Sequence, residues 1–404
     1  MGKSKGTRVN KRSRIGGRLA WGMALVAAWI APVAVSLCPT TAIAQVGLNP
    51  AIVSASPLSA QDKADVAKYV KDLMPDLRGG GADPAKEAAA VKKARTELTA
   101  PLLMKAVSVP FRQEYSRLLI QDEKLADLCK DKKDLIAINA LRLAGETAAS
   151  EMIALITGQL GDQRTSVRYA AGYATQRLFE QCAPVERSPA VTMDSLVEVV
   201  AKISARLSVE KEPLVFDMLV RSLFSASLYE RPKSEGVRSA AIKAMCGALS
   251  AGLKNAKFSD KTVLSSVVGI ASEFRTIMAA RGPQWAADDR KEVMGLAGDM
   301  VTWVANRVAA KELENNPNDA AAAATQKKED RKAALPIVRL AEVLIQETLK
   351  AEGIVGNKQI ILADHFEKGT NADDARFTGA FDAVVEDILV KKPFEFKSER
   401  FKYK

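Results

Sequence analysis

The sequence predicts an all-α fold, an α-solenoid of stacked helix pairs with extra N- and C-terminal helices. The first observation is that apolar residues recur at steps of three and four along most of the 404 residues, which places them on one face of a helix. The second is that the same spacing recurs in separate helical stretches, as stacked repeats require. The third is composition: at 48% hydrophobic, the chain can bury a sizeable core.

Composition excludes two classes of protein. The hydrophobic content rules out disorder throughout the chain. The charged residues, 26% of the total, are spread along the sequence, and only one long apolar run occurs. The chain is therefore not a polytopic membrane protein.

The first 44 residues have the order of a secretory signal peptide. Residues 1–18 contain seven Lys or Arg residues and no acidic residue, residues 19–37 are apolar, and Ala42-Ile43-Ala44 precedes Gln45. This order predicts cleavage after Ala44 and export to the periplasm or the outside of the cell. The alternative is a membrane anchor formed by residues 19–37, although Pro32 interrupts that run.

Cleavage would remove most of the excess positive charge. The full chain has 59 Lys and Arg and 48 Asp and Glu residues, whereas residues 45–404 keep 52 and 48, a net charge of +4. Nucleic-acid binding needs a clustered cationic face rather than a high overall charge, so no nucleic-acid partner is predicted. A membrane partner is predicted only if the leader is retained as an anchor.

Residues 45–111 are predicted to form an N-terminal helical segment. Helices are expected over 62–74 and 84–98, the second with Asp83 as its N-cap and a proline in its first position. The glycines Gly79–Gly81 between them favour a flexible hinge. They do not indicate a nucleotide-binding loop, because no Gly-Lys-Ser/Thr follows and no strand precedes them.

Regular helical spacing begins at Arg112. One helix is expected to carry Tyr115 to Leu128, the next Leu135 to Leu143, and a third to run from about Ala148 to Leu160. After the turn Gly161–Gln163, a helix carries small or apolar residues at offsets that fall on one face at 100° per residue. They are Val167, Ala170, Ala171, Ala174 and Leu178. The same offsets recur as Val215, Met218, Leu219, Ser222 and Ala226, and again as Val237, Ala240, Ala241, Ala244 and Ala248.

The turn from Asp162 to Arg168 resembles the inter-helix turn of the HEAT-repeat family and its HEAT-like relatives, in which an Asp stands six residues before an Arg. Asp162 and Arg168 keep that pair, whereas Pro232 takes the place of the Asp in the later unit. The resemblance covers about residues 112–253. It implies a right-handed α-solenoid in which Asp162 and Arg168 form a structural turn pair, and it implies partner binding along helix faces.

The rest of the chain is predicted to continue in helices. Residues 254–313 form a helical continuation, residues 314–332 a low-complexity linker rich in Ala, Lys and Glu, and residues 333–404 a C-terminal helical segment. Two stretches stay open. Ile360–Leu362 is a short strand or a buried turn, and residues 394–403 form an edge strand or an arm packed on the last helix.

Catalytic and metal-binding patterns are missing from the sequence. His365, the one histidine, lies in no nucleophile context, and no G-x-S-x-G or C-x-x-C occurs. We therefore predict no catalytic residue, no metal site and no cofactor. Cys129 and Cys182 fall near the ends of expected helices, where a disulfide could join two layers of an exported protein. Cys246 is expected to face a neighbouring layer or solvent.

One helix face is the candidate partner site. Four residues lie opposite the alanine stripe of their helix, and they are Tyr169, Tyr173, Gln176 and Glu180. Tyrosine offers rigid contact area at protein interfaces. The alternative is that these residues pack beneath the helix expected over 192–207 or the loop 183–190.

These observations together predict an exported, non-catalytic protein-binding scaffold in the cell envelope. Two alternatives remain. One is a HEAT-like enzyme of the bilin lyase type, which the repeat pattern also resembles. The other is a structural envelope component that the retained leader anchors in the membrane.

Overall fold

The described part of the chain is all-α. The computed structural model describes residues 47–185, 187–232, 234–314, 319–354 and 360–403. The expected signal peptide, its cleavage point and its anchor alternative lie outside these residues. Within them the chain has sixteen α-helices, several short 3₁₀ and π turns, and no strand beyond an isolated bridge between Ala149 and Ala190.

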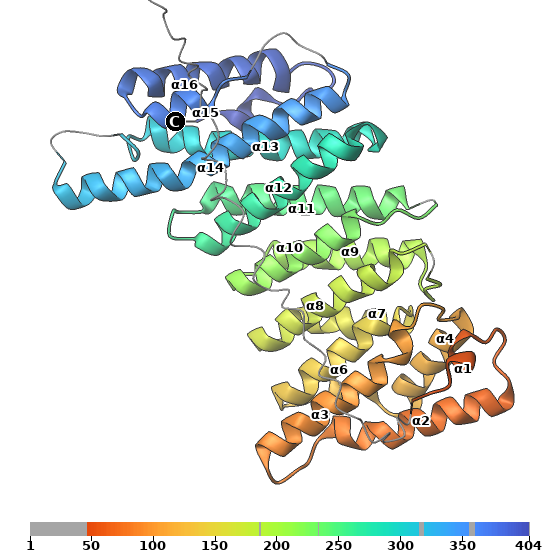
Figure 1. Ribbon diagram of the computed structural model, residues 1–404. Coiled ribbons are helices and arrows are strands. Elements are labelled where there is room, and N and C mark those ends of the chain that lie inside the picture. The colour runs from red at the N-terminus through yellow and green to blue at the C-terminus, as the bar shows by residue number, and fades with distance from the viewer. Residues whose placement is uncertain (1–46, 186, 233, 315–318, 355–359, 404) are drawn as a thin grey trace, which may run out of the picture. The chain divides into compact units, whose positions relative to one another are not determined.

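Most helices stack in chain order in two rows (Figure 1). The first, here the α8 row, contains α3 (Pro84–Thr99), α6 (Asp134–Thr147), α8 (Thr165–Cys182), α10 (Pro213–Ser227), α12 (Lys261–Arg281) and α14 (Ala321–Ala351). The second, the α11 row, contains α2 (Ala60–Arg78), α4 (Val109–Arg117), α7 (Glu151–Gly158), α9 (Met193–Leu207), α11 (Glu235–Asn255) and α13 (Ala287–Ala309).

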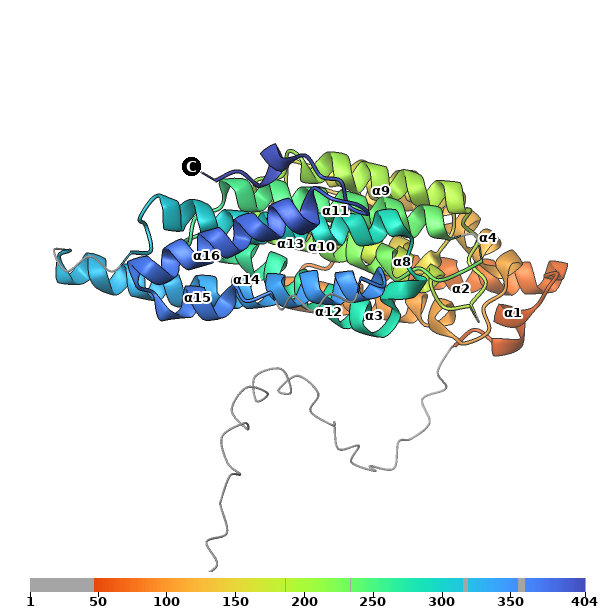
Figure 2. The ribbon, with the colours of Figure 1, turned by 90° about the horizontal axis from the view of Figure 1, so that it is seen from above.

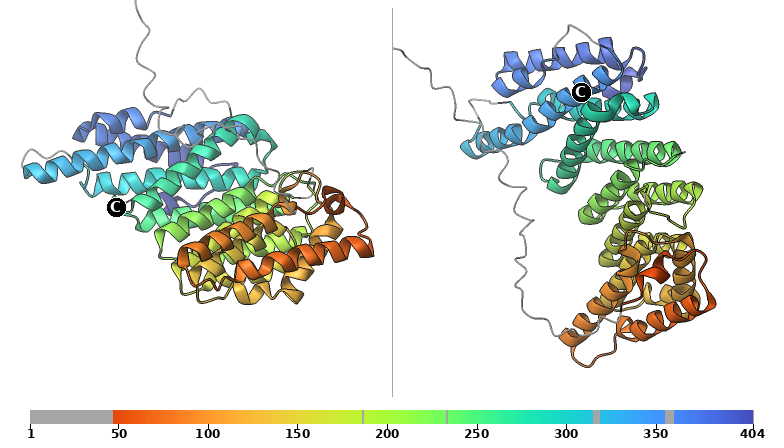
Figure 3. Two further views of the ribbon diagram at one scale, coloured as in Figure 1. Left: turned by 60° about the horizontal axis from the view of Figure 1, so that its bottom comes forward. Right: turned by 45° about the vertical axis from the view of Figure 1, so that its right-hand side comes forward.

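Each helix packs against the next helix of its own row, which makes the stack solenoid-like as the spacing predicts. Figure 2 shows α9 and α11 on one side of the stack and α3 and α12 on the other. The layered order is visible from two further directions in Figure 3. The rows extend on both sides of residues 112–253, because the pairs α2–α3 and α13–α14 belong to the same stack.

The helix expected across Tyr115 to Leu128 is interrupted, which corrects that prediction. α4 ends at Arg117, a π turn spans Leu118–Asp122, and the short α5 covers Leu125–Leu128. Lys124 between them has φ 52°, a left-handed conformation that cannot continue a right-handed helix. The three other helices outside the rows are α1 (Pro50–Ser54), α15 (Ala363–Lys368) and α16 (Asn371–Val384).

The glycines between α2 and α3 form a turn that side chains close, rather than a free hinge. Gly79 and Gly80 have φ values of 70° and 109°, which residues with a Cβ rarely adopt. The Glu87 carboxylate accepts hydrogen bonds from the Gly80 amide at 2.7 Å and from Lys133 Nζ at 2.8 Å. Asp83 caps α3 as expected, since its carboxylate accepts from the second and third amides of that helix.

Small residues let α6, α8 and α10 approach closely. A Cβ on Gly145 of α6 would lie 2.7 Å from the Ala174 carbonyl oxygen of α8, so only glycine fits there. On the other side of α8, a Cβ on Gly172 would meet side chains of α10 at 3.1 and 3.2 Å. The hydroxyls of Thr175 and Ser222 form a buried hydrogen bond of 2.8 Å between the same two helices.

Two of the three predicted stripes are buried, and the third is not. The stripes that begin at Val167 and Val215 are at most 3% exposed throughout. On α11, by contrast, Ala240, Ala244 and Ala248 are partly exposed. The larger side chains on the opposite side of α11 bury more apolar area, and they fill the core instead: Ile242, Met245, Cys246, Leu249 and Leu253.

The expected linker over 314–332 is helical from Ala321, where α14 begins. Alanine, lysine and glutamate are strong helix formers, and the helix continues without interruption into a stripe buried against α12 and α13. The prediction of a linker therefore fails for residues 321–332.

Both open questions near the C-terminus have the same outcome: neither segment is a strand. Ile360–Leu362 is an irregular segment in which Ile360 and Leu362 are buried and Ile361 is 37% exposed. Residues 394–403 form an arm that packs on α13, with Phe401 against Gly298 and Arg400 against Gly295. The Tyr403 hydroxyl donates to Asp382 of α16 at 2.9 Å, so the arm also contacts the last helix.

Among the described helices, one is long and apolar enough to cross a membrane by length and composition alone. It contains α12 and runs over Lys261–Gln284. In this structure α12 packs between α10 and α14 and contributes Val267, Ile270 and Phe274 to the core. A core helix passes the same length and composition test.

Candidate protein-binding surface on α8

The four predicted site residues lie on one side of α8, here the α8 surface: Tyr169, Tyr173, Gln176 and Glu180. Tyr169 is 41% exposed, and the other three are partly buried. The opposite side of the helix packs against α6 and α10. At this exposure Tyr169 is not the covered residue that the packing alternative predicts.

Tyr173 contacts α6 rather than α9. The guanidinium carbon of Arg142 lies 5.4 Å from the centre of the Tyr173 ring, within the range of a cation–π contact. Arg95 of α3 belongs to the same cluster, because burial and the nearby charge of Arg142 both lower its pKa. The cluster of Tyr173, Arg142 and Arg95 therefore joins the α8 surface to α6 and α3.

Near the C-terminal end of α8, side chains of the helix form an ion-pair network around Glu146 of α6. The Arg177 guanidinium donates to both Glu146 carboxylate oxygens at 2.6 and 3.1 Å, and Gln181 donates to one of them at 2.6 Å. Arg177 also pairs with Glu180, which accepts from Gln176 at 2.8 Å. Burial lowers the pKa of Arg177, but the hydrogen bonds and charges of Glu146 and Glu180 outweigh it, so the pKa lies above the ordinary value.

Beneath this network, Arg112 is fully buried and serves the fold. Its guanidinium donates to the carbonyls of Thr147 at 2.7 Å, Glu146 at 3.3 Å and Leu102 at 3.3 Å. These are final carbonyls of α6 and of a 3₁₀ turn, where the helix dipole favours a positive charge. Burial lowers the pKa of Arg112 to about 10, which leaves it cationic at neutral pH.

The residues of the expected turn pair meet through the backbone. Arg168 donates to the main-chain carbonyl of Asp162 at 3.0 Å, whereas the Asp162 carboxylate accepts from Arg164 at 3.0 and 3.1 Å. Arg168 also donates to the Glu210 carboxylate at 2.9 and 3.2 Å, and so joins α8 to the turn before α10. The pair thus links neighbouring layers, although its side chains do not pair with each other.

Glu210 is the most strongly held carboxylate at this surface. Its side chain is 1% exposed. Burial raises its pKa, but hydrogen bonds from Arg168, the Glu212 amide and Arg206 outweigh that effect and hold the pKa at about 2. Two exposed apolar residues flank Glu210 in the sequence: Val209 at 60% and Leu214 at 61% exposure.

The disulfide considered between Cys129 and Cys182 is not formed in this structure, where Cys129, Cys182 and Cys246 are free and buried. Cys129 follows α5, which packs on α6, whereas Cys182 ends α8 near Arg112 and Arg231. The two thiols therefore lie in different surroundings. Burial raises the pKa of Cys182 to about 12, which keeps it protonated. Cys246 faces the neighbouring layer, near charged residues of α13.

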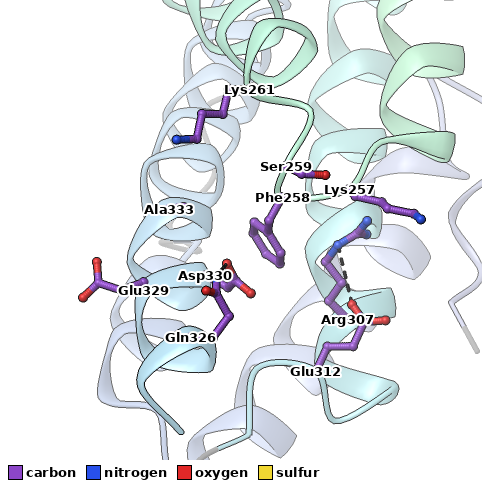
Figure 4. A pocket seen from close by; sticks show the side chains of 10 residues that line it. All are labelled: Lys257, Phe258, Ser259, Lys261, Arg307, Glu312, Gln326, Glu329, Asp330 and Ala333. Atoms are coloured by element: carbon purple, nitrogen blue, oxygen red, sulfur yellow. Dashed lines mark hydrogen bonds and ion pairs between the residues drawn. The ribbon is translucent and has the colours of Figure 1, made fainter. Parts of the chain in front are cut away.

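Several hollows lie elsewhere in the described stack, and two of them show how its surface is lined. A cavity of about 680 Å³ between α9 and α11 is lined by small residues, including Ala240, Ala244 and Ala248. A second, of about 640 Å³, lies between the turn that holds Phe258, the end of α13 and the start of α14 (Figure 4). Figure 4 shows that cations and carboxylates both line it, and Arg307 is already engaged there by Glu312 and by stacking on Trp303 at 3.8 Å.

Within the described ranges, no three His, Cys, Asp or Glu side chains form a group that could hold a metal ion. His365 lies on α15, and its buried Nδ1 has no hydrogen-bond partner. The residues that sequence reasoning missed are Arg95 and Arg142. No local spacing connects them to Tyr173, because the three come from three helices that are distant in the sequence.

Comparisons with known proteins add little. No family model matches the chain, and no curated protein matches it in sequence. Among solved structures, an engineered protein from a structural genomics consortium is 14% identical, covering 87% of this chain and 98% of that chain, with a TM-score of 0.26. A similarity at that level supports no statement about fold or function.

Proposed function

We propose that this chain is an exported, non-catalytic scaffold of HEAT-like helix pairs that binds a protein partner through the α8 surface. The observation that carries the proposal is the exposed Tyr169 ring. It is the one aromatic side chain among the large hydrophobic residues that the described part of the chain exposes. Tyrosine and arginine are the residues most enriched at the energetic centres of protein interfaces.

The surroundings of Tyr169 support the same function. Val209 and Leu214 add exposed apolar area on either side of Glu210, which the Arg168 side chain joins to α8, and Arg142 adds a cation on the adjoining helix. The Arg168–Glu210 link and the close α6–α8–α10 packing hold these groups on rigid helices. A preorganised surface loses little conformational entropy on binding.

The test is chemical crosslinking of the full-length protein in the envelope fraction, followed by mass spectrometry of the captured partner. Tyr169→Ala is expected to reduce recovery of that partner by about tenfold or more, as loss of a central interface tyrosine does. Leu228→Ala is the matched control, since Leu228 is similarly exposed at 43% but lies at the far end of α10. Equal recovery with both variants would refute the α8 surface as the partner site.

The compartment is tested by the mature N-terminus. Export with cleavage after Ala44 predicts a protein that begins at Gln45. Recovery of the protein in the cytosol with residues 1–44 intact would contradict export, and their retention in the membrane fraction would favour the anchored alternative.

A further inference from the structure

Two arginines beside the α8 surface lack a counterion in the described part of the chain. Arg142 makes no hydrogen bond and no ion pair there, only its contact with the Tyr173 ring, and its Nε is buried without a partner. The Nε of Arg95 is also buried without a partner, and the one side-chain contact of Arg95 is a 3.4 Å hydrogen bond to its neighbour Thr96.

The nearby carboxylates are already occupied. Glu146 is held by Arg177 and Gln181, and Glu180 by Arg177 and Gln176. No acidic side chain remains for the guanidiniums of Arg95 and Arg142. The two positive charges therefore lie near each other on adjacent helices, and the Glu146 carboxylate, which is hydrogen-bonded by Arg177 and Gln181, offsets the charge of Arg95 only from a distance.

Such an arrangement destabilises the free protein. A buried unsatisfied donor is unfavourable, and like charges that are partly removed from water repel each other. The arrangement becomes favourable when an anion accepts hydrogen bonds from both guanidiniums, because charge-assisted hydrogen bonds are the strong ones. The Tyr173 hydroxyl makes no hydrogen bond within the described residues, and the Tyr173 side chain lies beside both arginines.

We propose that Arg95 and Arg142, together with Tyr173, bind a carboxylate from an acidic segment of the protein partner. This inference rests on the proposed function and names the chemistry of the partner. Arg95 and Arg142 hold the acidic side chain. Tyr169, which lies about one turn before Tyr173 on α8, contacts an apolar side chain of the same segment. The partner segment is therefore both acidic and apolar.

The charges around the site favour a carboxylate over a nucleic acid. Within the described part of this cluster, two cations lack an acidic partner, Arg95 and Arg142, whereas nucleic-acid binding draws on several phosphate contacts. Glu180 lies at one end of the same helix face and would repel a continuous phosphate backbone. One carboxylate matches the number of free guanidiniums, and it leaves Glu146 and Arg177 paired as they are.

The test measures binding of a fluorescent peptide of alternating Glu and Leu to the full-length protein by anisotropy at low and high salt. We expect saturable binding that salt weakens. Arg95→Gln and Arg142→Gln are each expected to weaken it about tenfold, the effect of losing one charge-assisted hydrogen bond. Arg142→Lys keeps the charge without the planar fork and is expected to fall between Gln and the parent.

The matched control removes a cation from the side of α3 opposite Arg95. Lys86 is exposed and makes no ion pair among the described residues, and at 100° per residue it lies opposite Arg95 on the helix. Lys86→Gln is therefore expected to leave affinity within about twofold of the parent. The melting temperature of Arg142→Gln is expected to equal or exceed that of the parent, because removal of the unsatisfied Nε and of the repulsion with Arg95 offsets the loss of the contact with the Tyr173 ring.

Several outcomes would overturn the inference. They are equal binding by the arginine variants and the lysine control, equal binding of a Gln and Leu peptide, and tighter binding of a single-stranded oligonucleotide than of the Glu peptide. If Tyr169→Ala abolishes partner recovery while Arg95→Gln and Arg142→Gln retain it, the proposed function stands and this inference fails. If the arginine variants lose the Glu peptide while partner recovery is insensitive to Tyr169→Ala, the anion site stands and the proposed partner surface fails.

Discussion

Helices α8 and α11 begin with the same pattern, Val-Arg-x-Ala-Ala, and use it differently. In α8 both alanines of the pattern are buried between α6 and α10, whereas in α11 Ala241 is buried and Ala240 lines the cavity beside α9. α8 and α11 also stand in different rows. The Arg of each pattern joins its helix to the next layer, Arg168 through Glu210 and Arg238 through Asp289. The pattern therefore specifies the link between layers and not the face that is buried.

The largest expected effect on stability is at the close contact between α6 and α8. Gly145→Ala places a Cβ 2.7 Å from a backbone oxygen of α8, which cannot move as a side chain can. We expect a loss of about 3 kcal/mol in the free energy of unfolding, the upper end for overpacking, measured by urea denaturation. A loss below about 1 kcal/mol would show that α6 and α8 separate easily.

The second effect is acid sensitivity at the Arg168–Glu210 link. The pKa of Glu210 is about 2 in the folded protein, below its ordinary value of 4.5. The stabilisation is therefore fully present above pH 4.5 and is lost as the pH falls towards 2, by about 2 to 3 kcal/mol. Glu210→Gln is expected to reduce this pH dependence in urea titrations.

Glu198→Gln on α9 is the control for acid sensitivity, because Glu198 belongs to an exposed pair with Lys202. It is expected to keep the pH dependence of the parent. An equal reduction in both variants would assign the acid sensitivity to carboxylates in general rather than to the link.

The third effect compares two positions on α8 itself. Tyr173→Ala removes a partly buried ring and its contact with Arg142, and is expected to lower the free energy of unfolding by about 1 kcal/mol. Tyr169→Ala is expected to change it by less than about 0.5 kcal/mol, as an exposed site does. A large loss at Tyr169, measured by thermal denaturation, would show that its ring is buried in solution.

The smallest expected effect is a gain, rather than a loss, in the free energy of unfolding. A Cβ on Gly247 of α11 meets no atom within 4 Å. Gly247→Ala is therefore expected to stabilise the protein by about 0.5 to 1 kcal/mol, because alanine is the better helix former. A loss of stability like that of Gly145→Ala would show that the side of α11 that carries Gly247 is packed against other atoms and is not open.

The sequence predicts what depends on local spacing. The stripes that begin at Val167 and Val215 and the cap at Asp83 follow from helical periodicity and end signals. The face that α11 buries does not, because its two sides differ only in the size of their apolar residues. The left-handed Lys124 that ends the π turn also carries no residue signal, since lysine is not a residue typical of that conformation.

The candidate site could be predicted only in part. Tyr169 and Tyr173 lie on one helix, so periodicity places them together. Arg95 and Arg142 come from earlier helices, and their closeness to Tyr173 follows from the order in which α3, α6 and α8 stack. Their lack of a counterion depends on which acids are already paired, and this is a property of the folded protein alone.

The row of α3, α6 and α8 has a consequence for local opening of the chain. Because each layer touches only its neighbours, helices of a stack can unfold in small groups rather than all at once. A ligand that bridges Arg95, Arg142 and Tyr173 would touch three successive layers. Occupancy would therefore couple these helices into one cooperative unit, and backbone amides from α3 to α8 would exchange hydrogen with solvent more slowly and together, while those of α12 and α14 would keep their own rates.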